Sequence, residues 1–259
     1  MQEYCICKSK NIQPKLIVFE AELCYTMGCM STIEFKQALS MATFDPNRAI
    51  GRHVEAVELG VFDSLSRELI DRTLNDVFRR EYLYPTRVTP EGKVLVKNEP
   101  VQGEPSRTID HFSADIYAEN FFLLSKKERQ TMFYGVSIHS HPVDFPPSPE
   151  DLRRLMYSDM EPDAATAVFV VTPVRRIAIF RGDQTPGLSV ENAEMKVRLW
   201  ERNLRERMNQ FGEKDMPIQV YDALQKRAQD AQIRQITSTY KLSTFSAPLS
   251  EGILRRGLL

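Results

Sequence analysis

The most informative stretch of the sequence is residues 135–152, which read GVSIHSHPVDFPPSPEDL. Residues 134–138, at its start, have the apolar character of the end of a buried strand. Side chains two positions apart on a strand point to the same face, so His139 and His141 are expected to aim at one point. Pro142 has no backbone N–H to give to a sheet, and the strand is therefore expected to end there.

A helix is expected to begin after the proline-rich loop. Ser148 has the position of an N-cap, Pro149 that of the first helical residue and Asp151 that of N3, which is the arrangement of a capping box. Asp151 can equally serve as a third metal ligand beside the two histidines. The two roles are compatible, and both signals in one strand–loop–helix unit favour a metal site over a cap alone.

Two neutral imidazoles and one carboxylate suit a zinc ion. Catalytic zinc sites have three protein ligands and keep a fourth position for water, whereas structural sites have four protein ligands. Zinc lowers the pKa of its bound water towards neutrality and makes hydroxide available as a nucleophile. The sequence therefore predicts Zn2+ held by His139, His141 and Asp151, while Ser140, which faces the opposite side, is given no catalytic role.

The order His-Ser-His-Pro, short loop, Ser-x-x-Asp resembles the signature of the JAMM metallopeptidases, also called MPN+ or JAB/MPN domains. These are zinc isopeptidases that remove ubiquitin or ubiquitin-like proteins from their conjugates. The resemblance covers about residues 53–182, and the loop between proline and serine, residues 143–147, is one residue shorter than is usual in the family. It implies a cytidine-deaminase-like α/β sheet flanked by helices. It also implies attack of a zinc-bound water on the C-terminal carbonyl of the modifier.

The resemblance also assigns a general base. In the family, a glutamate early in the strand after the first helix takes the proton of the water and later delivers it to the leaving amine. Glu81 matches by position, at the start of the predicted strand 81–88, with Glu55 and Glu58 as alternatives. The family usually has a glycine- and leucine-rich stretch after this glutamate, whereas this chain has Tyr-Leu-Tyr-Pro. Ser148 matches the serine that holds the water and stabilises the oxyanion.

Apolar periodicity predicts the remaining elements. The predicted strands are residues 16–23, 54–62, 93–98, 164–171 and 174–180. The predicted helices are residues 31–42, 63–80, 114–128, 190–211 and 218–236. The helix 63–80 is expected to bury Leu65, Leu69, Ile70, Leu74, Val77 and Phe78, which fall at helical spacing. The tail, residues 238–259, shows little periodicity and is expected to be partly disordered.

The chain is thus expected to have three parts: an N-terminal extension (residues 1–50), the JAMM/MPN metallopeptidase domain (51–187) and a C-terminal helical extension (188–259). The C-terminal helices carry apolar stripes that suit packing on the domain or a protein partner. The departures from the family pattern fit a divergent, prokaryotic member that serves a ubiquitin-like conjugation system.

The composition indicates which partners the protein is expected to bind and in which compartment it is expected to act. With 34 basic and 35 acidic residues, the charge is balanced, which argues against a nucleic-acid or membrane partner. No apolar run is long enough to span a bilayer, and the first residues lack the features of a secretory signal, so a cytoplasmic location is expected. Cys5, Cys7, Cys24 and Cys29 are then expected to be reduced thiols, with a second, structural zinc as the alternative. His111 is expected near a turn and not as a ligand.

Two other functions compete with the peptidase. One is an MPN-fold scaffold subunit of a larger complex without catalysis, although members that serve only as scaffolds typically lack the full ligand set. The other is a JAMM-like protein of the RadC type, which would be expected to carry His-Asn-His-Pro where this chain has His-Ser-His-Pro. The expected activity is therefore that of a zinc metallopeptidase acting on ubiquitin-like conjugates.

Overall fold

A computed structural model of the chain describes residues 16–19, 32–44, 49–51, 53–88, 94–97, 99–103, 134–158, 164–210 and 216–257. The four cysteines, His111 and the predicted helix 114–128 lie outside these ranges.

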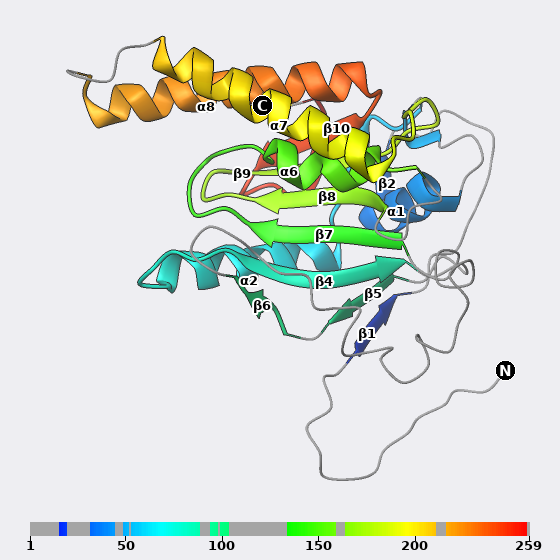
Figure 1. Ribbon diagram of the computed structural model, residues 1–259. Helices are drawn as coiled ribbons and strands as arrows, with labels where there is room; N and C mark the ends of the chain where they lie inside the picture. The colour runs from blue at the N-terminus through cyan, green and yellow to red at the C-terminus, as the bar shows by residue number, and fades with distance from the viewer. Residues whose placement is uncertain are drawn as a thin grey trace, which may run out of the picture.

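One mixed sheet forms the centre of the molecule (Figure 1). Its strands lie in the order β1 (Leu16–Phe19), β5 (Val94–Lys97), β4 (Tyr82–Val88), β7 (Tyr134–Ser140), β8 (Ala165–Val171), β9 (Arg175–Phe180), β10 (Ser243–Pro248), β11 (Ile253–Arg256), β3 (Ala56–Glu58) and β2 (Thr32–Glu34), and β6 (Val101–Gln102) also pairs with β4. The β7–β8 and β2–β3 pairs are parallel, and the other pairs are antiparallel. The predicted α/β class is confirmed at this level.

Helices cover both faces of the sheet (Figure 1). On one face lie α1 (Phe35–Phe44) and α2 (Val61–Asn75), and on the other lie α6 (Pro149–Arg153), α7 (Val190–Asn209) and α8 (Ile218–Thr239). Two short 3-10 turns, η1 (Ala49–Gly51) and η2 (Arg154–Met156), complete the described elements.

Strand β8 shows why the sequence of a central strand is apolar on both of its faces. Phe169 and Val171 pack in the core under α1 and α2, while Val168 and Val170 pack in the core under α6, α7 and α8. A strand covered on both faces favours apolar side chains on both of its sides. The predicted strands 164–171 and 174–180 are confirmed as β8 and β9.

The same alternation decides which side of the sheet carries the histidine motif. Val136 and Ile138 of β7 point into the core under α1 and α2. Ser137 and His139 therefore point to the face covered by α6, α7 and α8.

The prediction for α2 is wrong at its C-terminal end. The helix stops at Asn75, and Leu74, Val77 and Phe78 are 42%, 91% and 70% exposed instead of buried. Asp76 leaves the helical conformation, and its carboxylate accepts a hydrogen bond from the backbone N–H of Phe78. Aspartate side chains compete in this way with helical hydrogen bonds, so the chain turns here even though the apolar spacing continues.

The start of α2 also differs from the prediction. The predicted strand 54–62 is reduced to β3, and α2 already begins at Val61. Gly60 lies between them with φ at 55°, a left-handed conformation that glycine adopts without steric cost. Similarly, Thr32–Glu34, predicted as helix, pairs with β3 as strand β2, and α1 follows from Phe35.

The tail was expected to be partly disordered, and this expectation is wrong for residues 243–256. Strand β10 pairs with β9 along its whole length, and β11 joins β10 to β3. Phe245 of β10 is completely buried beside Phe180, with ring centroids 5.8 Å apart. The sheet therefore contains strands from residues 1–50 and from residues 188–259 as well as from the segment between them.

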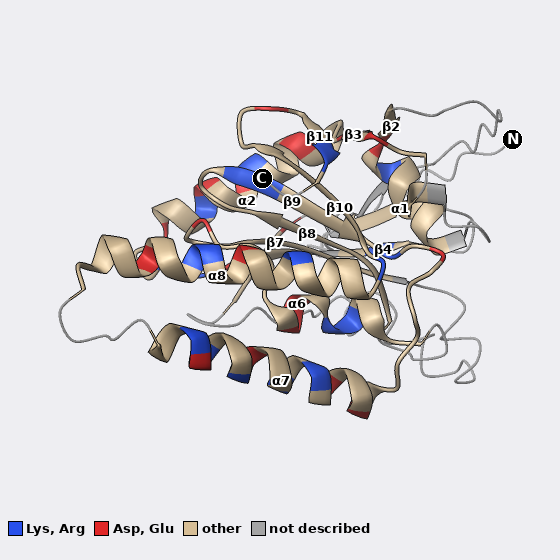
Figure 2. Ribbon diagram, turned by 90° about the horizontal axis from the view of Figure 1, so that it is seen from above, with Lys and Arg blue, Asp and Glu red and all other residues tan. Residues whose placement is uncertain are grey.

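The predicted C-terminal helices are confirmed as α7 and α8. Ala193, Val197 and Met208 of the predicted apolar stripe are buried, whereas charges of both signs lie along the other faces (Figure 2). None of the helices in the described part of the chain has the length and apolar character required to cross a membrane.

Candidate metal centre

Three elements bring the predicted ligands together. Strand β7 carries His139, and a hydrogen bond of 2.8 Å from the His141 backbone N–H to the Val171 carbonyl continues its pairing with β8. After Pro142 the chain crosses a short loop and enters α6, whose third residue is Asp151. The five-residue loop is therefore long enough to return the carboxylate to both histidines.

The ligand groups of the three residues lie close together, and each oxygen of the Asp151 carboxylate faces a different histidine. His139 Nε2 lies 3.2 Å from His141 Nε2, Asp151 Oδ1 lies 3.4 Å from His139 Nε2, and Asp151 Oδ2 lies 3.6 Å from His141 Nε2. His139 and His141 are buried, and the Asp151 side chain is partly exposed. In the described part of the chain, His139, His141 and Asp151 are the histidine, cysteine or acidic side chains that lie close enough together to hold a metal ion.

These separations match those of a tetrahedral zinc site. Zinc–nitrogen bonds of about 2.0–2.1 Å at tetrahedral angles place two ligand atoms about 3.3 Å apart. The observed 3.2, 3.4 and 3.6 Å are close to that value, with Oδ1 of Asp151 nearest His139 and Oδ2 nearest His141. The residues present therefore fit a metal ion, with the carboxylate as the third donor.

Both imidazoles are oriented through their other ring nitrogen. His141 Nδ1 lies 3.2 Å from the Phe145 carbonyl oxygen, which can only accept, so Nδ1 carries the proton and Nε2 keeps its lone pair for a metal. His139 Nδ1 lies 2.9 Å from the Ser137 hydroxyl. When the Ser137 hydroxyl donates to His139 Nδ1, the Nε2–H of His139 faces His141 Nε2 at 3.2 Å, and a metal ion would take the place of that proton.

Ser148 holds the carboxylate in place. Its backbone N–H and its hydroxyl both donate to Asp151 Oδ2, at 2.6 and 2.8 Å, and its hydroxyl oxygen accepts from the Asp151 backbone N–H at 3.1 Å. The predicted capping box is therefore confirmed. Because the hydroxyl proton is donated to Asp151, Ser148 acts on the candidate ligand directly in this arrangement.

The electrostatics of the three candidate ligands favour a positive charge. Burial alone would raise the pKa of Asp151, but the adjacent imidazoles of His139 and His141 outweigh it and hold that pKa well below its usual range. Burial alone would lower the pKa of His141, but Asp151, Glu81 and the Phe145 carbonyl raise it above its usual value. The carboxylate thus stays ionised and stabilises a positive charge beside it, which in the metal-free site is a proton on an imidazole and which a metal ion would replace.

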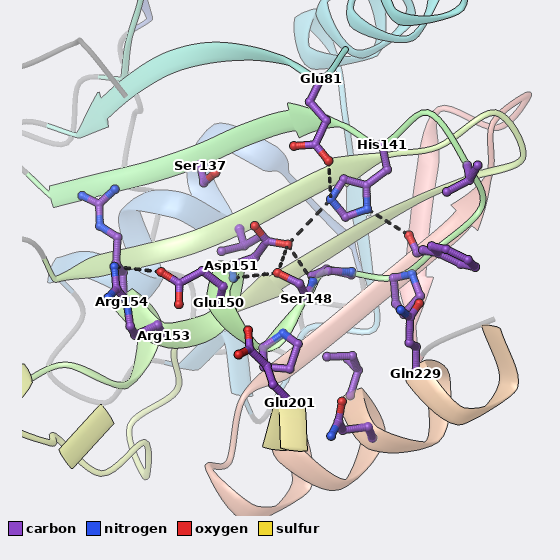
Figure 3. Close-up of a pocket in the computed structure, with 18 of the residues that line it drawn as sticks. Glu81, Ser137, His141, Ser148, Glu150, Asp151, Arg153, Arg154, Glu201 and Gln229 are labelled. Atoms are coloured by element: carbon purple, nitrogen blue, oxygen red, sulfur yellow. Dashed lines mark hydrogen bonds and ion pairs between the residues drawn. The ribbon is translucent and has the colours of Figure 1, made fainter. Parts of the chain in front are cut away.

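Glu81, directly before the neighbouring strand β4, also lies beside the candidate ligands. In the antiparallel β4–β7 pair, Leu83 lies opposite His139, and this register places Glu81 opposite His141. Glu81 Oε1 is 3.9 Å from His141 Nε2. Figure 3 shows Glu81 on one side of His141 and Asp151 with Ser148 on the other. A carboxylate at this place can exchange protons with a molecule held between the ligands.

The site opens into a cleft of about 790 Å³. Its walls come from the end of β7, the following loop, α6 and the two C-terminal helices. Figure 3 shows Glu201 of α7 and Gln229 of α8 on the side of the cleft away from Glu81. The C-terminal helices therefore form part of the cavity that contains the candidate ligands.

The remaining sequence-based candidates lie elsewhere. Glu55 and Glu58 belong to β3 and the residues just before it, and strands β8, β9, β10 and β11 separate β3 from β7. Ser140 faces α2, where its hydroxyl contacts Thr73 and accepts from the Tyr82 backbone N–H. The structure thus brings Glu81 to the ligands and leaves Glu55 and Glu58 at the other end of the sheet.

Two contributors were not identified from the sequence. Ser137 shares the strand parity of His139 and His141, and this period of two is a signal that could have identified it. The Phe145 carbonyl has no such signal, because a main-chain oxygen is the same in every residue. Its role depends on the path of the loop.

Comparison of the chain with protein-family models, with curated proteins and with solved structures found no match.

Proposed function

We propose that the protein is a zinc-dependent isopeptidase or peptidase of the JAMM type. Its substrates would be conjugates or precursors of ubiquitin or a ubiquitin-like protein. The observation that carries the proposal is the triangle of His139, His141 and Asp151 in a cleft, with Glu81 beside it. Hydrolytic zinc sites combine three protein ligands with a carboxylate that moves protons.

The order of elements supports the family assignment within the proposal. Strand β3, helix α2 and strand β4 follow one another, and Glu81 stands directly before β4, where the family has its general base. The histidine strand, the loop and the capped helix α6 follow in the order of the family signature.

Each residue has a distinct task in the proposed reaction. Zinc, when held by His139, His141 and Asp151, would make a water molecule acidic enough to supply a nucleophile near neutral pH. Glu81 takes a proton from the attacking water and gives it to the departing amine, which must leave protonated. Ser148 fixes Asp151, and turning its hydroxyl towards the substrate would let it donate to the oxygen of the carbonyl under attack.

The experiment begins with metal content, measured by elemental analysis on wild type and on Asp151→Ala. About one zinc per wild-type chain, lost in Asp151→Ala, is expected. Hydrolysis of ubiquitin-like fusion substrates is then compared between wild type and Glu81→Gln. This variant removes the base but none of the ligands, so it should keep its zinc and lose activity by at least about 100-fold.

Two results would overturn the proposal, and a third would change its mechanism. Wild type without zinc under metal-replete conditions would leave the chain as the alternative scaffold protein. Iron in place of zinc would point to oxygen chemistry, because two histidines and one carboxylate also bind ferrous iron. A Glu81→Gln variant with wild-type hydrolysis would remove Glu81 from the mechanism.

A further inference from the structure

A network of four charged side chains joins the loop after the histidines to the C-terminal helix α8. Arg175 of β9 is 3% exposed and donates to two carboxylates from different elements, Asp144 Oδ1 at 2.8 Å and Asp230 Oδ1 at 2.8 Å. Lys226 of α8 lies 3.2 Å from Asp144 Oδ2 and 3.5 Å from Asp230 Oδ2. Thr172 donates a further hydrogen bond of 3.0 Å to Asp144.

Asp144 occupies the tip of a very tight turn. The backbone N–H of Phe145 donates to the Val143 carbonyl at 2.8 Å, so Asp144 lies between the two residues that close the turn. Its carboxylate points towards β9 and α8, whereas the side chain of Val143 is exposed. The turn is thus tied to the rest of the protein through Asp144.

The next residue after Asp144 orients a candidate ligand. The Phe145 carbonyl accepts from His141 Nδ1 and fixes the tautomer that presents Nε2 to a metal. A displacement of the turn would move this carbonyl. The contacts of Asp144 and the contact that orients His141 thus belong to the same tight turn.

We propose that Asp144, Arg175 and Asp230 are positioning residues for the metal centre, through which helix α8 holds the ligand loop in its metal-binding geometry. The proposal rests on the metal site proposed above. A desolvated guanidinium that bridges two carboxylates gains directional hydrogen bonds, but replacing such groups by apolar packing is often neutral or stabilising. Its presence between loop and helix is therefore better explained by the geometry it imposes than by added stability.

The neighbouring arginine provides a matched control. Arg176 points to the opposite face of β9, is completely buried and pairs with Asp63 of α2 at 2.6 Å. Asp63→Asn therefore weakens the pairing of a buried arginine on the same strand with a partly exposed carboxylate of α2, away from the cleft. Any loss of general stability should be shared by the control.

The first measurement is zinc affinity, by competition with a chromophoric chelator, for wild type, Asp144→Asn, Asp230→Asn and Asp63→Asn. Loss of partners behind a ligand typically weakens metal binding by about 10–100-fold, which we expect for Asp144→Asn. Asp230→Asn should show a smaller loss in the same direction, and Asp63→Asn should stay within about twofold of wild type. Zinc-binding wild type with all three variants within twofold would overturn the proposal.

The second measurement does not depend on metal. In the metal-free protein, hydrogen–deuterium exchange at the amides of Val143, Asp144, Phe145 and Ser148 should be faster in Asp230→Asn than in wild type or Asp63→Asn. Equal exchange in the three proteins would overturn the proposal even if wild type bound no zinc. Faster exchange without zinc binding in wild type would retain the anchoring of the loop and refute the metalloenzyme alone.

Discussion

Two serines on opposite faces of β7, three positions apart in the sequence, have different tasks. Ser137 shares the face of His139 and bonds to its Nδ1 atom, whereas Ser140 bonds to Thr73 and to the backbone of Tyr82. Both are serines in the same strand. Their substitution distinguishes a residue that orients a candidate ligand from one that stabilises the core.

Ser137→Ala should weaken zinc affinity by about 10-fold or more with little loss of stability, because His139 loses the group that orients it. Ser140→Ala should leave zinc affinity unchanged and lower the free energy of unfolding by about 1–3 kcal/mol, since the Tyr82 N–H loses a buried acceptor. Chelator competition and urea denaturation measure the two quantities. Equal zinc affinity in Ser137→Ala and wild type would contradict the orienting role.

At the scale of elements, α6 is a short helix whose N-terminal cap is also the support of a candidate ligand. Ser148 caps α6 and donates to Asp151, while Ser189 caps α7 by accepting from the Asn192 backbone N–H at 3.4 Å. The two serines thus have the same capping role on helices of different function.

Ser148→Ala and Ser189→Ala should each lower the free energy of unfolding by about 0.5–2 kcal/mol, the usual cost of losing such a cap. Ser148→Ala should in addition weaken zinc binding, because Asp151 loses the hydroxyl that holds Oδ2. Thermal unfolding and chelator competition would be run on both variants. If Ser189→Ala weakened zinc binding as much as Ser148→Ala, the effect would have to be attributed to general destabilisation.

At the scale of the whole molecule, the last strands complete the sheet. Strand β10 lies between β9 and β11, and Phe245 packs with Phe180 in the core that α1 and α2 cover. The tail is therefore part of the same folded unit as the candidate metal centre.

Phe245→Ala should lower the free energy of unfolding by about 3–5 kcal/mol, since a large buried side chain is replaced by a cavity. Ile253→Ala, at an exposed position of β11, should cost about 1 kcal/mol or less. Denaturant unfolding of both variants tests this, and a cost below about 1 kcal/mol for Phe245→Ala would show that the tail is not part of the core.

The tertiary structure also corrected the predicted secondary structure where local sequence patterns were weak or misleading. The segment 243–248 reads STFSAP and has little β-branched periodicity, yet it is a buried strand because β9 and β11 supply partners on both sides. Conversely, the apolar spacing of α2 continues to Phe78, but the helix ends earlier because the Asp76 carboxylate accepts a hydrogen bond from the backbone N–H of Phe78.

The sequence by itself determined the local geometry of the site. Two-residue spacing put His139 and His141 on one face, and the capping pattern put Asp151 at the start of a helix, because both depend on sterics and hydrogen bonds between near neighbours. Only the tertiary structure decided that Glu81 lies beside His141, that Phe145 orients it and that α8 holds the loop. These contacts depend on the β4–β7 register and on packing between elements far apart in the chain, which no local pattern specifies.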